Sequence, residues 1–213
     1  MVAGGKGTRM GNETPKQFLE LLGKPILLHT LEKFDGIADE IILVLPASHI
    51  SYWQTLLSNF PDAPAHRIAE GGETRTASVL NGLSAITGEG VVAIHDAVRP
   101  LVSRELIIRT FDTATRQGSA VPLTEVRDSL REKDGTGSVP VDRSRFLAVQ
   151  TPQCFRSKLL KEAYARAGND VYTDDATVFG MAGYDITPVQ GEHSNIKITY
   201  PEDLIFASAV LGG

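Results

Sequence analysis

The first residues of this chain that could do chemistry form a glycine-rich, cationic loop. Three of residues 4–7 are glycines, which allow positive φ angles and close approach of the backbone to a ligand. Successive amides of such a loop can form an anion-binding nest. Lys6, Arg9 and Lys16 add three cations within eleven residues of an otherwise acidic chain. The loop therefore predicts a polyphosphate site, and the added Lys16 favours a nucleoside triphosphate.

The loop differs from the two most familiar phosphate motifs. The Walker pattern needs Gly-Lys-Ser/Thr after four spacer residues, and the dinucleotide fingerprint needs a third glycine three residues after the second. Residues 3–10, in the order Ala, Gly, Gly, Lys, Gly, Thr, Arg, Met, are instead similar to the signature loop of nucleotidyltransferases that activate sugars and polyol phosphates.

Several further segments concentrate polar residues that a core would not hold. They are residues 71–78, with two adjacent glycines, Arg75 and Ser78; 95–100, with Asp96 and Arg99; 127–129 and 142–143; 151–153; 172–175; and 195–199, with Lys197. Two interpretations of Asp174 and Asp175 stay open: they are ligand-binding residues, or they are acidic residues in the first turn of a helix, where the helix dipole favours them. Trp53 and Tyr52 are interpreted as packing residues rather than a base-stacking pair.

Composition excludes several classes of protein. The net charge of −5 argues against a nucleic-acid partner, which would require a basic face. No apolar run is long enough to cross a bilayer, so we expect no membrane partner. The single cysteine, Cys154, leaves no cysteine-based metal site and fits a reducing cytoplasm. We interpret Cys154 as a small buried hydrophobic residue.

Hydrophobic periodicity predicts an α/β fold with a doubly wound, Rossmann-like, mostly parallel sheet. The expected strands are residues 40–45, 65–70, 90–96 and 120–123, and the expected helices are 26–34, 51–59, 78–86 and 103–117. Ligands of such sheets bind beyond the carboxyl ends of the strands. The turns at Gly4, Gly71 and Asp96 all follow expected strands, which predicts a single site at that edge.

The strand ahead of the first loop is short. Met1 and Val2 alone precede the loop, whereas a strand in this position normally has about five residues. We therefore expect a few further residues of this strand to precede Met1.

Residues 125–150 interrupt the alternation of strands and helices. Residues 134–137, Asp-Gly-Thr-Gly, are a hairpin signal between expected strands 126–133 and 138–149. This polar hairpin would protrude from a single domain that spans residues 1–213. Because a two-stranded arm is marginally stable alone, we expect it to dock on a second subunit and form a homodimer.

In their order along the chain, these segments closely resemble the 2-C-methyl-D-erythritol 4-phosphate cytidylyltransferase family of the non-mevalonate isoprenoid pathway. The resemblance runs from Ala3 to about Leu211. Its most specific parts are residues 15–17, Pro-Lys-Gln; 95–100, His-Asp-Ala-Val-Arg-Pro; 151–153, Thr-Pro-Gln; and 195–197, Asn-Ile-Lys, followed by Pro-Glu-Asp at 201–203. The family resemblance implies transfer of CMP from CTP to 2-C-methyl-D-erythritol 4-phosphate, with release of pyrophosphate. Triphosphate chemistry implies Mg²⁺ as the cofactor.

The resemblance also implies a role for each site residue. Ala3, Gly4, Gly5, Gly72 and Ser78 would surround the cytosine; Gly7, Arg9 and Lys16 would hold the triphosphate; Asp96 would meet the ribose or the Mg²⁺; Arg99, Ser129, Arg143, Thr151 and Thr173 would hold the polyol phosphate; and Lys197 would contact the α-phosphate. Catalysis would depend most on Arg9, Lys16, Arg143 and Lys197. Ser129 stands where the family usually has threonine, and Glu73 where a shorter aspartate is frequent.

Three alternative functions share parts of this pattern. A ribitol-5-phosphate cytidylyltransferase would have the same loop and chemistry and would differ near Ser129, Arg143 and Thr173. A non-catalytic nucleotide-binding domain would not need Arg9, Lys16, Asp96 and Lys197 together. A sugar-1-phosphate nucleotidyltransferase usually has a longer chain with extra C-terminal structure.

Overall fold

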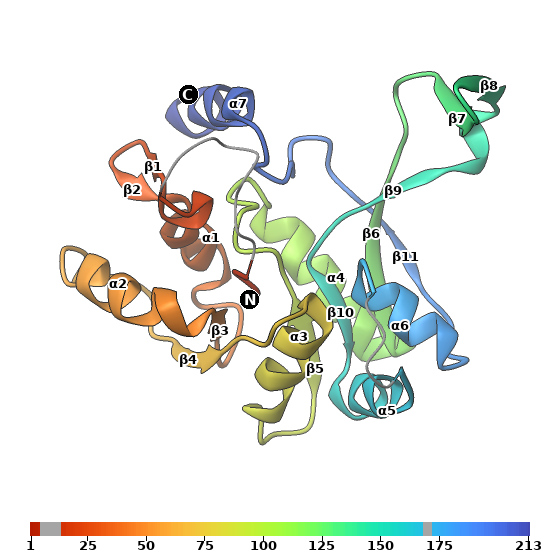
Figure 1. Ribbon diagram of the computed structural model, residues 1–213. Helices are drawn as coiled ribbons and strands as arrows, with labels where there is room; N and C mark the ends of the chain where they lie inside the picture. Colours follow the sequence, from red (N-terminus) through yellow and green to blue (C-terminus); the bar gives the residue numbers. More distant parts are fainter. Residues whose placement is uncertain (5–13, 168–171) are drawn as a thin grey trace.

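The computed structural model describes residues 1–4, 14–167 and 172–213, in which strands alternate with helices (Figure 1). In chain order the elements are η2 (Lys16–Phe18), β1 (Glu20–Leu21), β2 (Lys24–Pro25), α1 (Ile26–Phe34), β3 (Ile42–Leu45), α2 (Ala47–Leu57), β4 (Arg67–Glu70), α3 (Arg75–Ser84), β5 (Val91–Ile94), α4 (Arg104–Gln117), β6 (Ser119–Glu125), β7 (Leu130–Asp134), β8 (Gly137–Val141), η3 (Arg143–Arg145), β9 (Leu147–Val149), β10 (Gln153–Arg156), α5 (Ser157–Ala167), α6 (Asp175–Met181), β11 (Pro188–Gln190) and α7 (Pro201–Gly212).

The strands that carry the glycine turns are parallel. β3 pairs in parallel with β4, and Val2 bridges in parallel to Val44 of β3 and to Asp96, just beyond β5. β6 and β11 are also parallel, whereas β10 lies antiparallel between β5 and β6. The predicted α/β fold with a doubly wound, mostly parallel sheet is confirmed, and the antiparallel β10 is an addition that the sequence pattern did not indicate.

The sheet is buried on both faces by two separate hydrophobic cores. Side chains of α1, α2 and α4 pack with Leu43 and Leu45 of β3 in one core. Side chains of α3, α5 and α6 pack with Val92 and Ile94 of β5 in the other. Helices on both faces explain why β3 is an unbroken apolar run rather than an alternating one. Cys154 of β10 is fully buried, which agrees with its interpretation as a small hydrophobic residue.

Local sequence signals set the helix ends next to the candidate site. The Thr74 hydroxyl accepts from the Ala77 amide and caps α3, and Asp174 caps α6 through the Thr177 amide. The predicted helix 26–34 matches α1 at both ends. Among the described helices, none is both long and apolar enough to span a membrane.

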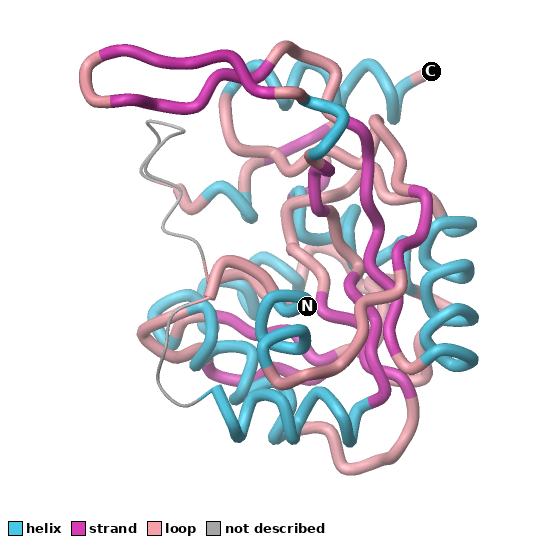
Figure 2. The backbone as a smooth tube through the Cα atoms, turned by 90° about the vertical axis from the view of Figure 1, so that its right-hand side faces the viewer, coloured by secondary structure: helices cyan, strands magenta, loops and turns pink. Residues whose placement is uncertain are grey.

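The arm differs from its predicted form. β7 and β8 form a hairpin that projects from the body of the protein (Figures 1 and 2). The predicted second strand, 138–149, is wrong beyond Val141, because η3 follows there and β9 returns to pair antiparallel with β6. The prediction therefore merged one strand of the arm with one strand of the main sheet, since both are short and have no glycine or proline between them.

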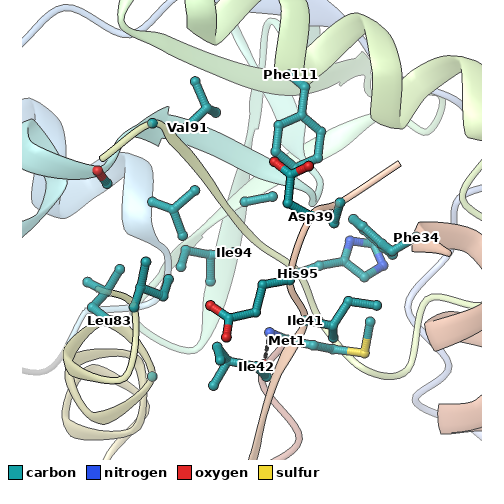
Figure 3. A pocket seen from close by; sticks show the side chains of 18 of the residues that line it. Met1, Phe34, Asp39, Ile41, Ile42, Leu83, Val91, Ile94, His95 and Phe111 are labelled. Atoms are coloured by element: carbon teal, nitrogen blue, oxygen red, sulfur yellow. Dashed lines mark hydrogen bonds between the residues drawn. The ribbon is translucent and has the colours of Figure 1, made fainter. Parts of the chain in front are cut away.

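A cavity of about 650 Å³ lies between β3 and β5, toward the amino ends of these strands. Figure 3 shows that its walls include Ile42, Leu83, Ile94 and Phe111. Its lining is mainly aliphatic, and the described residues that form it include no lysine or arginine that could bind a triphosphate. The chemistry predicted from the sequence therefore belongs elsewhere, at the carboxyl ends of the strands.

Candidate active site

The two glycine turns meet at the carboxyl edge of the sheet. A Cβ atom placed on Gly4 would lie 3.7 Å from Ser78 Oγ, so the first loop begins beside the start of α3. The Gly71 amide donates to the Leu45 carbonyl over 2.7 Å, which ties the second turn to the end of β3. The edge predicted from the strand ends therefore brings Ala3 and Gly4 together with Gly72 and Ser78.

The second turn requires glycine at its centre. A Cβ on Gly72 would lie 2.4 Å from the Ala77 Cβ, a separation that no side chain tolerates. The Gly72 amide donates to Ser78 Oγ over 3.1 Å, and the Ser78 hydroxyl is within 2.9 Å of the Thr74 carbonyl, to which it donates. The hydrogen bonds of the buried Ser78 side chain therefore hold the turn in place.

A cluster of charges surrounds Asp96 at the end of β5. Asp96 Oδ2 lies 3.0 Å from Arg99 Nε and 3.2 Å from Lys197 Nζ. Burial alone would raise the pKa of Asp96, but Lys197 and then Arg99 hold it well below its usual range. The Lys197 side chain is 43% exposed, and its ammonium group faces the carboxylate.

Thr151 and Asn195 hold this cluster in place from the neighbouring segments. Thr151 Oγ1 accepts from the Asp96 amide over 3.1 Å and lies 3.0 Å from His95 Nδ1. Arg99 donates through Nη1 to the Asn195 carbonyl over 2.8 Å, and Asn195 donates through Nδ2 to the Thr151 carbonyl. Burial lowers the pKa of His95 to about 3, so it is neutral and acts as a support for the loop.

The residues that follow the first glycine-rich loop also lie beside this cluster. Lys16 is buried, and its Nζ donates to the Ile198 carbonyl over 3.0 Å, next to Lys197. Gln17 Nε2 donates to the Ala3 carbonyl over 3.0 Å. Both ends of the glycine-rich loop are therefore anchored at the site. Gly5, Gly7 and Arg9 lie outside the described residues.

The acceptor residues predicted on the arm lie apart from this cluster. Ser129 and Arg143 are exposed, and the Arg143 guanidinium donates to the Arg127 carbonyl within the arm. Figure 2 shows the hairpin extending away from the body. In the part of the chain that the structure describes, no hydrogen bond or ion pair joins Ser129 or Arg143 to Asp96 or Lys197. Thr173 is also exposed, at the start of the segment that leads into α6.

Sequence reasoning missed a buried ion pair beside the cluster. Arg75 of α3 donates to Asp175 of α6 through both terminal guanidinium nitrogens, Nη1 and Nη2, and the Asp175 side chain is fully buried. Asp174 caps α6 and Asp175 lies in its first turn, which agrees with the interpretation of these acids as residues of a helix start. No sequence pattern pairs two residues that are 100 positions apart, so the partner of Asp175 could not be predicted.

Comparisons with known proteins give one consistent result. The family model for IspD, 2-C-methyl-D-erythritol 4-phosphate cytidylyltransferase, matches residues 1–213. A protein of that name from Phocaeicola vulgatus is 46% identical over 213 residues, which cover 99% of this chain and 97% of the relative. A protein of that name from Porphyromonas gingivalis is 46% identical over 212 residues, covering 99% and 96%.

Solved structures agree with the sequence comparisons. The Thermus thermophilus 2-C-methyl-D-erythritol 4-phosphate cytidylyltransferase superposes with a TM-score of 0.79 at 37% identity, covering 93% of this chain and 95% of that one. The 4-diphosphocytidyl-2C-methyl-D-erythritol synthase of Anaerococcus prevotii superposes with a TM-score of 0.83 at 30% identity, covering 100% and 96%. The resemblance predicted from the motifs is confirmed: this chain belongs to the 2-C-methyl-D-erythritol 4-phosphate cytidylyltransferase family of nucleotidyl-transferring enzymes.

Proposed function

We propose that the protein transfers CMP from CTP to 2-C-methyl-D-erythritol 4-phosphate. The products are 4-diphosphocytidyl-2-C-methyl-D-erythritol and pyrophosphate, in the non-mevalonate route to isoprenoid precursors. The main support for the proposal is that four charged residues lie together at one edge of the sheet; they are Lys16, Asp96, Arg99 and Lys197. These are charges that a nucleotidyl transfer needs and a structural core does not.

The nucleotide side of the site is assigned to the two glycine turns. We assign Ala3, Gly4, Gly5, Gly72 and Ser78 to the cytosine. The support is the closeness of Gly4 to Ser78 and the requirement for glycine at position 72, which brings backbone groups close to a ligand. A pocket that reads a base by hydrogen bonds discriminates strongly against a base with exchanged donors and acceptors.

The phosphate chemistry requires charge and positioning rather than a protein nucleophile. A phosphate oxygen of the acceptor attacks the α-phosphorus of CTP, and the bond from that phosphorus to the bridging oxygen of the leaving group breaks. The electron pair leaves with pyrophosphate, so negative charge grows on the α- and β-phosphates. We assign Lys16 and Lys197 to this charge, together with Gly7 and Arg9 from the first loop.

The donor set is compatible with Mg²⁺ held mainly by the substrate. Among the described residues, no three His, Cys, Asp or Glu side chains are grouped to hold a metal. Mg²⁺ in phosphate-transfer sites is usually bound by one or two carboxylates together with substrate phosphates. Asp96 is ionised and lies in the charged cluster, so it is the residue we assign to the ion. Bound Mg²⁺ would neutralise triphosphate charge.

The acceptor side is proposed to form between two subunits. Arg99, Thr151 and Thr173 would come from one subunit, and Ser129 and Arg143 from the arm of its partner. Residues 1–213 would form one nucleotidyltransferase domain, with 125–150 as the dimerisation arm. Apolar side chains exposed on the arm and β9 support a covering partner; they are Val139 at 42%, Phe146 at 46%, Leu147 at 54% and Val149 at 40% exposure. A cytoplasmic location stays a prediction.

The proposal is tested by pyrophosphate release with CTP, UTP and ATP, each with 2-C-methyl-D-erythritol 4-phosphate and Mg²⁺. We expect kcat/KM for CTP to exceed that for UTP by about 100-fold or more, because UTP presents an acceptor where CTP presents a donor. Chelation of Mg²⁺ should stop release, and its return should restore it. Equal turnover of CTP and UTP would contradict the assignment of the glycine turns to cytosine.

A further inference from the structure

A buried carboxylate outside the charged cluster has partners from two other elements. The Asp175 side chain has no exposed surface, and both of its oxygens accept hydrogen bonds from the Arg75 guanidinium. The Tyr164 hydroxyl donates to Asp175 Oδ1 over 2.5 Å. A buried charge is costly unless it is paired and hydrogen-bonded, and here all of these conditions are met. The transfer step described above does not use this group.

The ion pair connects the two sides of the proposed site. Arg75 is the first residue of α3, three positions after Gly72. Asp175 is the first residue of α6, two positions after Thr173. Gly72 lies in the glycine turn assigned to cytosine, residues 71–72, which we call the cytosine turn. Thr173 lies in the segment assigned to the acceptor, residues 172–175, which we call the acceptor segment. Because each partner of the ion pair is within three residues of one of these contacts, the ion pair constrains the distance between the cytosine turn and the acceptor segment.

Two more contacts reinforce the same junction. The Tyr172 amide donates to Thr76 Oγ1 over 3.3 Å, again between the acceptor segment and α3. Gln153 Oε1 accepts from the Asp175 amide over 3.1 Å and from the Ala176 amide over 2.8 Å. Gln153 follows Thr151, which binds the Asp96 loop, by two residues. The junction therefore reaches the charged cluster as well.

We propose that Asp175 is a positioning residue that, through Arg75, holds the cytosine turn in register with the acceptor segment. The inference rests on the proposed function, because that function assigns Gly72, Ser78 and Thr173 to the two substrates. A bidentate carboxylate–guanidinium pair fixes orientation as well as distance, which a single hydrogen bond does not. Burial alone would lower the pKa of Arg75, but Asp175 raises it above its ordinary value, so the guanidinium remains charged.

The test is Asp175→Asn, which keeps the side-chain shape and removes the charge. We expect the KM values for CTP and for the acceptor to rise together, each by about tenfold, in enzyme that remains folded. Both KM values should rise because the cytosine turn and the acceptor segment are then no longer held at a fixed distance from each other. A purely structural role would lower the Tm and the fraction of active enzyme, while both KM values would stay at those of the wild type.

A second variant and a matched control complete the experiment. Arg75→Lys keeps the positive charge but loses the planar guanidinium that donates two hydrogen bonds to Asp175. It should therefore raise both KM values even if Asp175→Asn does not fold. Glu40→Gln removes the carboxylate of the exposed pair with Arg67 and should change neither. Wild-type KM values in a folded Asp175→Asn or Arg75→Lys variant would overturn this inference alone. Absence of turnover in the wild type would remove the proposed function, and the inference with it.

Discussion

Replacement of Lys197 with alanine is expected to lower kcat by about 10²–10³-fold and to change the KM for the acceptor little. Lys197 Nζ lies 3.2 Å from Asp96 Oδ2 on a side chain that is 43% exposed, so the ammonium group can meet a phosphate without leaving the cluster. The charge it would offset grows in the transition state, which is why the loss should appear in kcat. Initial rates over a range of both substrates measure it.

The matched control is Lys24→Ala. Lys24 pairs with Glu32 at 2.7 Å, and its replacement should leave both constants unchanged. A Lys197→Ala enzyme with kcat within a few-fold of the wild type would remove Lys197 from the transfer step. An effect confined to KM would instead assign Lys197 to ground-state binding.

Mixing two inactive variants is expected to restore activity if the arm completes the site of its partner. Lys16→Ala removes a cation assigned to the triphosphate from the body of one subunit, and Arg143→Ala removes an acceptor contact from the arm. In a mixed two-fold dimer, one site regains both residues and the other lacks both. Random exchange of equal amounts gives half mixed dimers, so about a quarter of wild-type activity should return.

The exchange must be verified independently, for example by mass measurement of differently tagged subunits. A mixture that exchanges subunits and stays inactive would contradict the shared site, as would a protein that is monomeric and active. The variant Arg143→Lys, measured in the same series, should recover little of the activity, since lysine lacks the planar fork that binds a phosphate bidentately.

Most of the sheet could be predicted because its signals are local. The apolar run that becomes β3 ends at Pro46, and α4 begins at the Ser103 cap and ends at Gly118, whose φ of 93° favours glycine. β10 could not be predicted in this way. Its residues Gln153–Arg156 are partly polar and acquire strand geometry by pairing with β5 and β6, which are distant in sequence.

The candidate site shows the same division between local and long-range information. Gly72 and Asp96 were predicted as site residues because turns at strand ends have a recognisable composition. The contact of Lys16 with the Ile198 carbonyl spans 182 positions, and no spacing rule implies it. The strand ends predicted that the turns at Gly4, Gly71 and Asp96 share one site, and the family resemblance added Lys197 to it.

The proposed transfer of CMP to 2-C-methyl-D-erythritol 4-phosphate is tested most directly by the rate of pyrophosphate release from CTP with two acceptors measured side by side. These are 2-C-methyl-D-erythritol 4-phosphate and D-ribitol 5-phosphate, each with Mg²⁺ and wild-type enzyme, with the product identified by mass. We expect kcat/KM for the methylerythritol phosphate to be higher by about 100-fold, with 4-diphosphocytidyl-2-C-methyl-D-erythritol as the product. Equal or faster release with ribitol phosphate, or no release with either acceptor, would contradict it.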